Sequence, residues 1–168
     1  MNLKIRNEQP EDIERITALT VAAFEQEEHS SHTEHLIVDA LRRAGKLTVS
    51  LVALDHDEIV GHVAISPVTV SSGTKGWYGL GPISVWPNRQ GQGIGSTLMK
   101  AALAELKGQG ATGCVVLGDP GFYGRFGFKA HIGLELPGIP HEYFQALAFS
   151  GDLPAGTVQY HESFDAPE

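Results

Sequence analysis

The chain has 168 residues, of which 42% are hydrophobic and 19% charged, as in ordinary globular proteins. This length suits one domain with a sizeable core, spanning residues 1–168. The net charge of −8 argues against nucleic acid or an anionic membrane as the main partner. The single cysteine, Cys114, excludes an intrachain disulfide and lies in an apolar run that predicts a buried, inert thiol. With no apolar leader and no apolar run of membrane-spanning length, we expect a cytoplasmic protein.

The first third of the chain predicts one strand and two helices. Apolar and charged residues alternate over residues 3–6, which indicates a short strand. Apolar residues recur at helical spacing between Ile13 and Phe24. A second helix is expected from about Thr33 to Ala44, closed by a glycine.

The polar link between these helices contains His29, His32 and His35, spaced three apart, with Glu34 among them. Histidine and carboxylate ligands suit zinc. Residues three apart drift around a helix, however, and half of this stretch is expected to be loop. We therefore predict no metal site and interpret the segment as solvated.

Residues 47–54 and 59–70 are predicted to be strands joined by a polar hairpin turn. His62 and Ser66 share one face of the second strand, because side chains alternate along a strand. A structural role is favoured for His62. Because this strand should neighbour residues 80–86, His62 also stays open as a general base.

The central stretch predicts a strand, a glycine loop and the start of a helix. Apolar residues 80–86 stop at a proline, which cannot donate to a sheet ladder. Gly91, Gly93 and Gly95 follow. A helix should begin there, with apolar residues four apart on one face: Ile94, Leu98, Ala102 and Leu106. A helix N-terminus offers unpaired N–H groups and partial positive charge, so a phosphate or pyrophosphate is the expected ligand.

Two common phosphate motifs do not fit this loop. A P-loop needs lysine after its last glycine, and Ser96 stands there instead. A dinucleotide fingerprint needs G-x-G-x-x-G in a first βαβ unit, and this loop lies past the middle of the chain. The loop resembles the acyl-CoA pyrophosphate motif of the GNAT acetyltransferases, Q/R-x-x-G-x-G/A, which Gln90, Gly93 and Gly95 match.

A second segment strengthens the resemblance. Tyr123, Gly127 and Phe128 match the GNAT element Tyr-x-x-x-Gly-Phe. In that family the tyrosine lies near the CoA sulfur and commonly serves as general acid, whereas aromatic packing is the structural alternative. Many members carry asparagine where this chain has Gly118, so we assign no cofactor contact there. The strand of residues 80–86 also lacks the frequent glutamate base and offers only Ser84.

The resemblance covers nearly the whole chain, since residues 143–149 and 156–161 are predicted to be closing strands of the sheet. It implies an α/β fold of the GNAT type, with a mixed, mainly antiparallel central sheet flanked by helices. It further implies acetyl-CoA as co-substrate and Tyr123 as the catalytic acid. The implied cofactor-binding residues are Ile83, Ser84, Val85, Gln90, Gly91, Gln92, Gly93, Ile94, Gly95 and Ser96.

The implied reaction is N-acetylation of a primary amine on a small molecule or a protein. The base stays open between His62, Glu28 and water. By the family pattern, Glu28, His29 and Glu34 border the acceptor side, and the acidic chain favours cationic amines. Many relatives form homodimers, which the resemblance allows here. Two alternatives are a non-catalytic acyl-CoA sensor or partner-binding module, and a loop that binds another phosphorylated metabolite.

Overall fold

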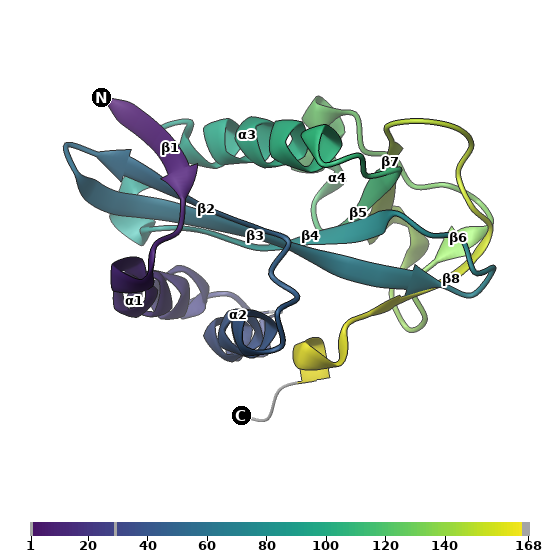
Figure 1. The fold of residues 1–168 in the computed structure, drawn as a ribbon, viewed down its shortest axis with the longest axis horizontal. Helices are drawn as coiled ribbons and strands as arrows, with labels where there is room; N and C mark the ends of the chain where they lie inside the picture. Colours follow the sequence, from purple (N-terminus) through teal and green to yellow (C-terminus); the bar gives the residue numbers. More distant parts are fainter. Residues whose placement is uncertain (1, 29, 166–168) are drawn as a thin grey trace.

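A computed structural model describes residues 2–28 and 30–165 (Figure 1). Its helices are α1 (Ile13–Phe24), α2 (Glu34–Arg43), α3 (Ile94–Gly108) and α4 (Pro120–Tyr123). Its strands are β1 (Leu3–Asn7), β2 (Val49–Asp55), β3 (Glu58–Val70), β4 (Trp77–Val85), β5 (Gly113–Leu117), β6 (Leu134–Glu135), β7 (Phe144–Ala148) and β8 (Gly156–Tyr160).

Six strands form a continuous row in the order β1-β2-β3-β4-β5-β7. All neighbours in this row are antiparallel except β4 and β5, which run parallel. The crossover from β4 to β5 is made by α3, as a parallel connection requires. The predicted class, a mixed and mainly antiparallel sheet with flanking helices, is confirmed.

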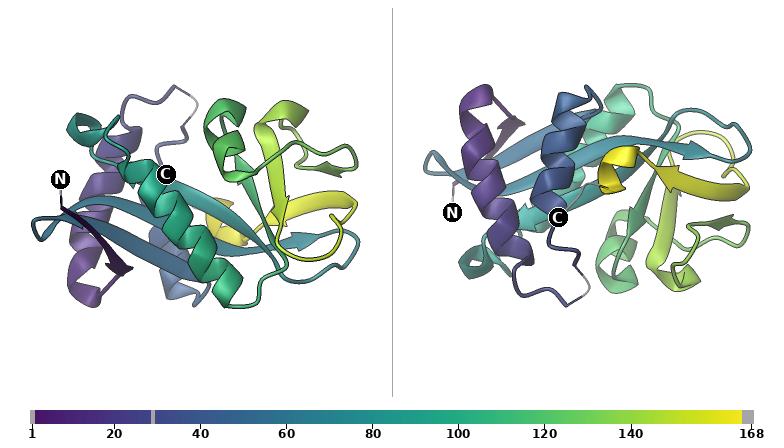
Figure 2. Two further views of the ribbon diagram at one scale, coloured as in Figure 1. Left: turned by 90° about the horizontal axis from the view of Figure 1, so that it is seen from above. Right: turned by 90° about the horizontal axis from the view of Figure 1, so that it is seen from below.

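Helix α3 covers one face of the sheet, and α1 and α2 lie side by side on the other face (Figures 1 and 2). Gly61 of β3 permits the close approach of α3, because a Cβ there would stand 2.8 Å from Leu98 Cδ1. The apolar row predicted for this helix is completely buried against the sheet: Ile94, Leu98, Ala102 and Leu106. Burial of that stripe, rather than helix propensity alone, holds α3 in place.

The opposite face of the sheet is covered in two places. Under α1 and α2, a cluster joins the helices to β2 and β3; its members include Ile16, Leu19, Val38, Val52 and Ile59. Towards the far end of the sheet, a second cluster forms around Trp77, with members from β3, β5, β7 and β8.

Several details differ from the sequence predictions. The strand predicted over residues 80–86 runs from Trp77 to Val85. Gly113 of β5 leaves room for the Trp77 indole, since a Cβ on Gly113 would lie 2.4 Å from the ring. The two-residue strand β6 was not predicted. Strand β8 does not continue the row of the sheet beyond β7; it pairs with the end of β3 and with β6. Within the described residues, no helix has both the length and the apolar character needed to cross a membrane.

Candidate active site

Strands β4 and β5 separate halfway along β4. They pair from Trp77–Gly113 to Leu80–Val116 and no further. Strand β4 nevertheless continues to Val85 alongside β3, with one extra residue inserted near residue 81, where the register shifts. Among the described strands, none pairs with residues 81–85 on the side facing β5. Their backbone edge on that side is therefore available to an extended ligand.

The glycine loop leads from β4 into α3. Gly91 and Gly93 adopt φ angles of 79° and 84°, in the left-handed region that favours glycine. Gly93 is the N-cap residue, and no side chain caps the helix. The first backbone hydrogen bond of α3 runs from Thr97 N–H to the Gly93 carbonyl. The N–H groups of residues 94–96 thus have no acceptor within the helix.

The electrostatics at the N-terminus of α3 favour the binding of an anion. No acidic side chain lies in the first turn of α3. The helix dipole places partial positive charge at the same point. Gly91 and Gly93 both have open space where a Cβ would stand, so their left-handed backbone, rather than crowding, explains the need for glycine.

The loop is held close to both the end of β4 and α4. Gln90 Nε2 donates to the Val85 carbonyl at 3.2 Å, and Gln92 Oε1 accepts from Arg89 Nε at 3.3 Å. A Cβ on Gly95 would lie 3.8 Å from Phe122 of α4. The structure therefore brings the predicted cofactor residues of β4 and the loop together, next to the segment that carries Tyr123.

Tyr123 ends the short helix α4, which Asp119 caps by accepting the Gly121 N–H at 3.0 Å. Its ring makes edge contacts with Phe122 and Phe128, at centroid distances of 5.0 and 6.2 Å. Burial, together with the nearby Asp119 carboxylate, raises the pKa of Tyr123 to about 12. The hydroxyl is consequently a proton donor at any working pH.

The residues considered as general bases lie in contrasting places. His62 is fully buried, and Ser50 Oγ lies 2.8 Å from its Nε2. Ser84 pairs directly with His62 across β3 and β4 and is also buried. Glu28 is exposed in the link between α1 and α2, whereas Glu34, at the start of α2, accepts a hydrogen bond from Ser30.

The histidines of this link show no metal-binding geometry in the part that is described. His29 lies outside the described residues. Among the described ones, no group of three or more His, Cys, Asp or Glu side chains is placed to hold a metal ion. Cys114 is buried, and burial raises the pKa of its thiol, so it is a poor nucleophile.

Comparison with known proteins identifies the family. Residues 4–130 match the family described as "Acetyltransferase (GNAT) domain". The chain belongs to the GNAT acetyltransferases. The N-acetyltransferase YhbS of Escherichia coli K12 is 38% identical over 169 residues, covering 96% of this chain and 98% of the relative. The expected enzyme class, an acyltransferase, is thereby confirmed.

Two solved GNAT structures are similar over the whole fold. An acetyltransferase from Brucella melitensis, in complex with acetyl-CoA, is 51% identical with a TM-score of 0.88, covering 98% of this chain and 99% of that chain. Escherichia coli YhbS in complex with CoA is 36% identical with a TM-score of 0.88, covering 98% and 93%.

Two features of this GNAT site were missed from the sequence. Gly118 was noted only as a departure from the family asparagine, yet a Cβ there would lie 2.5 Å from Tyr123 Cε2, so the glycine makes room for that ring. The polar partners of His62 were not foreseen either. Glu8 and Ser50 lie on other strands or loops, and no local pattern in the sequence connects them with residue 62.

Proposed function

We propose that the protein transfers the acetyl group of acetyl-CoA to a primary amine of a small molecule or a protein. The observation that carries this proposal is the parting of β4 and β5 beside the uncapped start of α3. The two similar structures named above are complexes with acetyl-CoA and CoA, which supports the same ligand here.

In this proposal the backbone N–H groups of residues 90–96 bind the pyrophosphate, helped by the dipole of α3. The open edge of β4 at Ile83, Ser84 and Val85 binds the pantetheine arm through backbone hydrogen bonds. The thioester then lies in the gap between β4 and β5, close to α4. Binding depends on local backbone dipoles, since the chain as a whole carries a charge of −8.

The chemistry is direct attack through a tetrahedral intermediate. The amine nitrogen forms a bond to the thioester carbon while a backbone N–H near Val85 stabilises the negative charge on oxygen. The C–S bond then breaks, and Tyr123 protonates the departing sulfur. Its raised pKa keeps that proton available. The proton released by the amine passes to a base.

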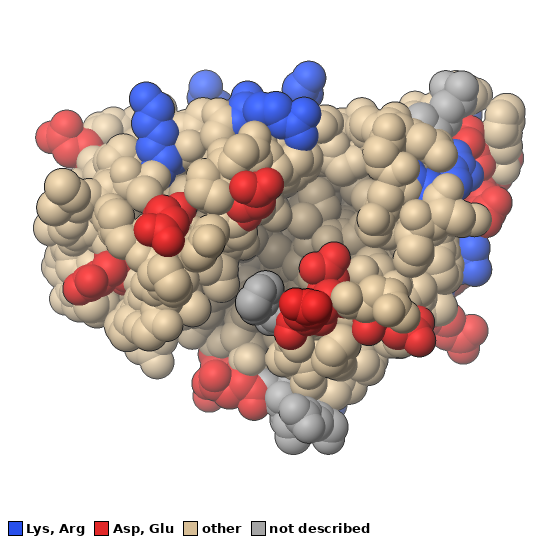
Figure 3. All heavy atoms as spheres, turned by 180° about the vertical axis from the view of Figure 1, so that it is seen from behind, with Lys and Arg blue, Asp and Glu red and all other residues tan. Residues whose placement is uncertain are grey.

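A cationic amine is the acceptor that the charge distribution favours. On the face opposite the view of Figure 1, the surface is hollowed; acidic side chains lie beside and below the hollow, and Lys or Arg side chains lie above it (Figure 3). The acidic side of the hollow attracts positively charged substrates. Polyamines, amino sugars and lysine side chains have this chemistry.

A non-catalytic acyl-CoA sensor is the second candidate, favoured by the absence of a carboxylate on the described β4. Turnover separates the two candidates. We expect acetyl transfer to at least one amine in a panel of spermidine, glucosamine, lysine and lysine peptides. Tight binding of acetyl-CoA without transfer to any of them would favour the sensor.

Calorimetric titration of acetyl-CoA tests the cofactor site through two isosteric variants, Gly93→Asp and Gly93→Asn. Both side chains tolerate a left-handed backbone better than most, so they differ mainly in charge. A unit charge about 4 Å from the pyrophosphate costs ~4 kcal/mol near a protein surface, so Asp should weaken binding by at least about 10²-fold more than Asn. Equal affinity in the wild type and in Gly93→Asp would place the phosphates elsewhere. No binding by the wild type would remove acetyl-CoA as the co-substrate.

A further inference from the structure

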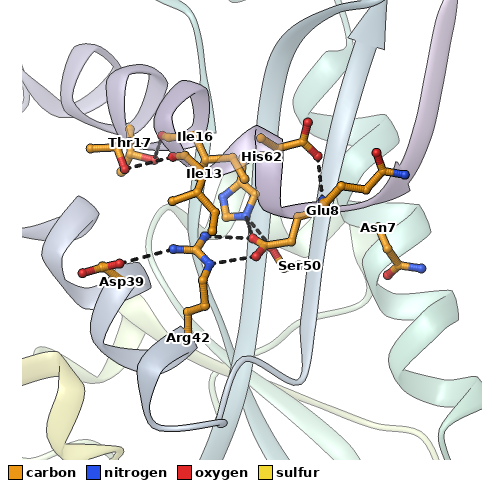
Figure 4. A network of polar contacts seen from close by, with 12 residues as sticks. Asn7, Glu8, Ile13, Ile16, Thr17, Asp39, Arg42, Ser50 and His62 are labelled. Carbon is orange, nitrogen blue, oxygen red and sulfur yellow. Dashed lines mark hydrogen bonds and ion pairs between the residues drawn. The ribbon is translucent and has the colours of Figure 1, made fainter.

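A line of polar side chains leads from His62 through Ser50 and Glu8 to Arg42 beneath α1 and α2 (Figure 4). On β4, Ser84 is the direct cross-strand partner of His62 and extends this line. His62 Nε2 lies 2.8 Å from Ser50 Oγ, and the Ser50 hydroxyl donates to Glu8 Oε1 at 2.5 Å. Glu8 is paired with Arg42 through two hydrogen bonds of 2.7 and 2.9 Å.

This line determines which nitrogen of His62 carries the proton. Because the Ser50 hydroxyl gives its hydrogen to Glu8, its oxygen can only accept from His62. His62 Nε2 therefore carries the hydrogen and donates it to Ser50. Nδ1 is left with a free lone pair, and no described group hydrogen-bonds to it. A buried basic nitrogen without a partner calls for an explanation in terms of function or of a bound molecule.

The hydroxyl of Ser84 on β4 likewise lacks a described hydrogen-bond partner. Ser84 is 2% exposed, and its Oγ has no hydrogen-bond partner among the described residues. It lies in the part of β4 that β5 leaves unpaired. As the direct cross-strand partner on the same face, its Cβ is expected about 4.5–5.5 Å from that of His62.

His62 is surrounded by few charged groups. The connection after β1 contributes Glu8 and α2 contributes Arg42, with Asp39 behind it. The sides of α1 shown in Figure 4 are apolar or carry a threonine whose hydroxyl donates to its own helix. Burial lowers the pKa of His62 to about 4, against the opposing influence of Glu8. The ring is therefore neutral at any ordinary working pH, and because the imidazolium is disfavoured, Nδ1 can take up a proton only as Nε2 gives up its own.

The other end of the line reaches solvent. Glu8 and Arg42 line a surface cavity of about 320 Å³ together with Asn7, Gly45, Leu47, Thr48 and Ser50. Their side chains are 16% and 17% exposed. A proton delivered to Glu8 can leave through the water of this cavity, because, against the effect of burial, the hydrogen bonds from Arg42 stabilise the ionised carboxylate and hold its pKa below the usual range.

We propose that Ser84 and His62 take up the proton released by the attacking amine, and that Ser50 and Glu8 position His62 and conduct that proton to the surface. This rests on the proposed acetyl transfer. The amine proton passes to Ser84 Oγ, whose own hydrogen moves to His62 Nδ1. These two atoms are not hydrogen-bonded to each other in this structure, so the transfer requires a bridging water or a rotation of the Ser84 side chain. The Nε2 hydrogen moves to Ser50, and the Ser50 hydrogen to Glu8. Because the described β4 carries no carboxylate that could act as the base, this route takes over that role.

Two matched variants test the route, Ser84→Ala and Ser66→Ala. Both remove a buried hydroxyl without a partner on the same face of the sheet, but Ser66 lies outside the line. With the best amine of the panel, we expect kcat of Ser84→Ala to fall by about 10²-fold, with unchanged KM for acetyl-CoA, and Ser66→Ala to match the wild type. Equal kcat in both variants would overturn the route. If the wild type acetylates no amine, the proposed function itself fails.

Nitrogen NMR of histidine-labelled protein supplies a readout that needs no acceptor. We expect His62 to show a protonated Nε2 and an unprotonated Nδ1 from pH 6 to 9, and Ser50→Ala, which removes its partner, to identify the signals. A hydrogen on Nδ1 would overturn the route even if the enzyme is active. If the network were purely structural, Ser84→Ala would keep the kcat of the wild type as long as its thermal stability is unchanged.

Discussion

Gly118→Ala tests the role of Tyr123 without touching its hydroxyl. In the native structure an added Cβ would lie 2.5 Å from Tyr123 Cε2, and ordinary carbon contacts are ~3.5–4 Å. Either the ring retreats by about 1 Å, or the backbone shifts from the φ of 157° at Gly118, a value that side chains rarely adopt. A displacement of that size at a reacting group costs about 10²-fold in rate. Overpacking costs about 1–3 kcal/mol, which lowers the Tm of a chain this long by about 2–12 °C.

The matched control is Gly124→Ala, one residue after Tyr123. Gly124 has a helical backbone, and no atom lies within 4 Å of its added Cβ. Stopped assays of acetyl transfer, calorimetry with acetyl-CoA and thermal unfolding should be run on both variants. We expect kcat to fall only in Gly118→Ala, with nearly unchanged acetyl-CoA affinity. If Gly118→Ala keeps the full kcat while its Tm falls, the position of the Tyr123 ring does not matter for catalysis, and the reasoning is refuted.

Two further predictions concern the acid and the stability of the N-terminal region. Tyr123→Phe should lower kcat by ~10²–10⁴-fold and leave acetyl-CoA binding intact. In the wild type, no loss of rate from ionisation of this hydroxyl should be seen below about pH 10. A fully active phenylalanine variant would exclude Tyr123 as the acid. Hydrogen bonds from Arg6 and the Gln9 N–H hold the pKa of buried Asp12 below its usual range. Its stabilisation is therefore complete above the ordinary carboxyl pKa and is lost as the pH falls through the lower folded value. Urea midpoints measured from pH 6 to 2.5 should fall less steeply in Asp12→Asn, and parallel curves would contradict this linkage.

Local patterns were sufficient for much of the fold. The four-residue spacing from Ile94 to Leu106 predicted α3 and its buried face because a helix repeats every 3.6 residues. The proline after residue 86 and the glycines after it marked the end of β4 and the loop, with the strand ending one residue earlier than expected. The GNAT resemblance rested on the same short stretch and on the segment from Tyr123 to Phe128. The family match confirms that resemblance.

The tertiary structure decided what no short segment encodes. The β4–β5 pairing ends at Leu80, close to the extra residue of β4 near residue 81, and the pairing of β8 with β3 joins residues about ninety positions apart. The need for glycine at residue 118 arises from a ring that folds back onto it and from a backbone φ of 157°. The line from Ser84 to Glu8 assembles side chains from three strands and a loop. Sequence determines which groups can bond, but only packing brings such distant groups within hydrogen-bond distance and excludes water from them.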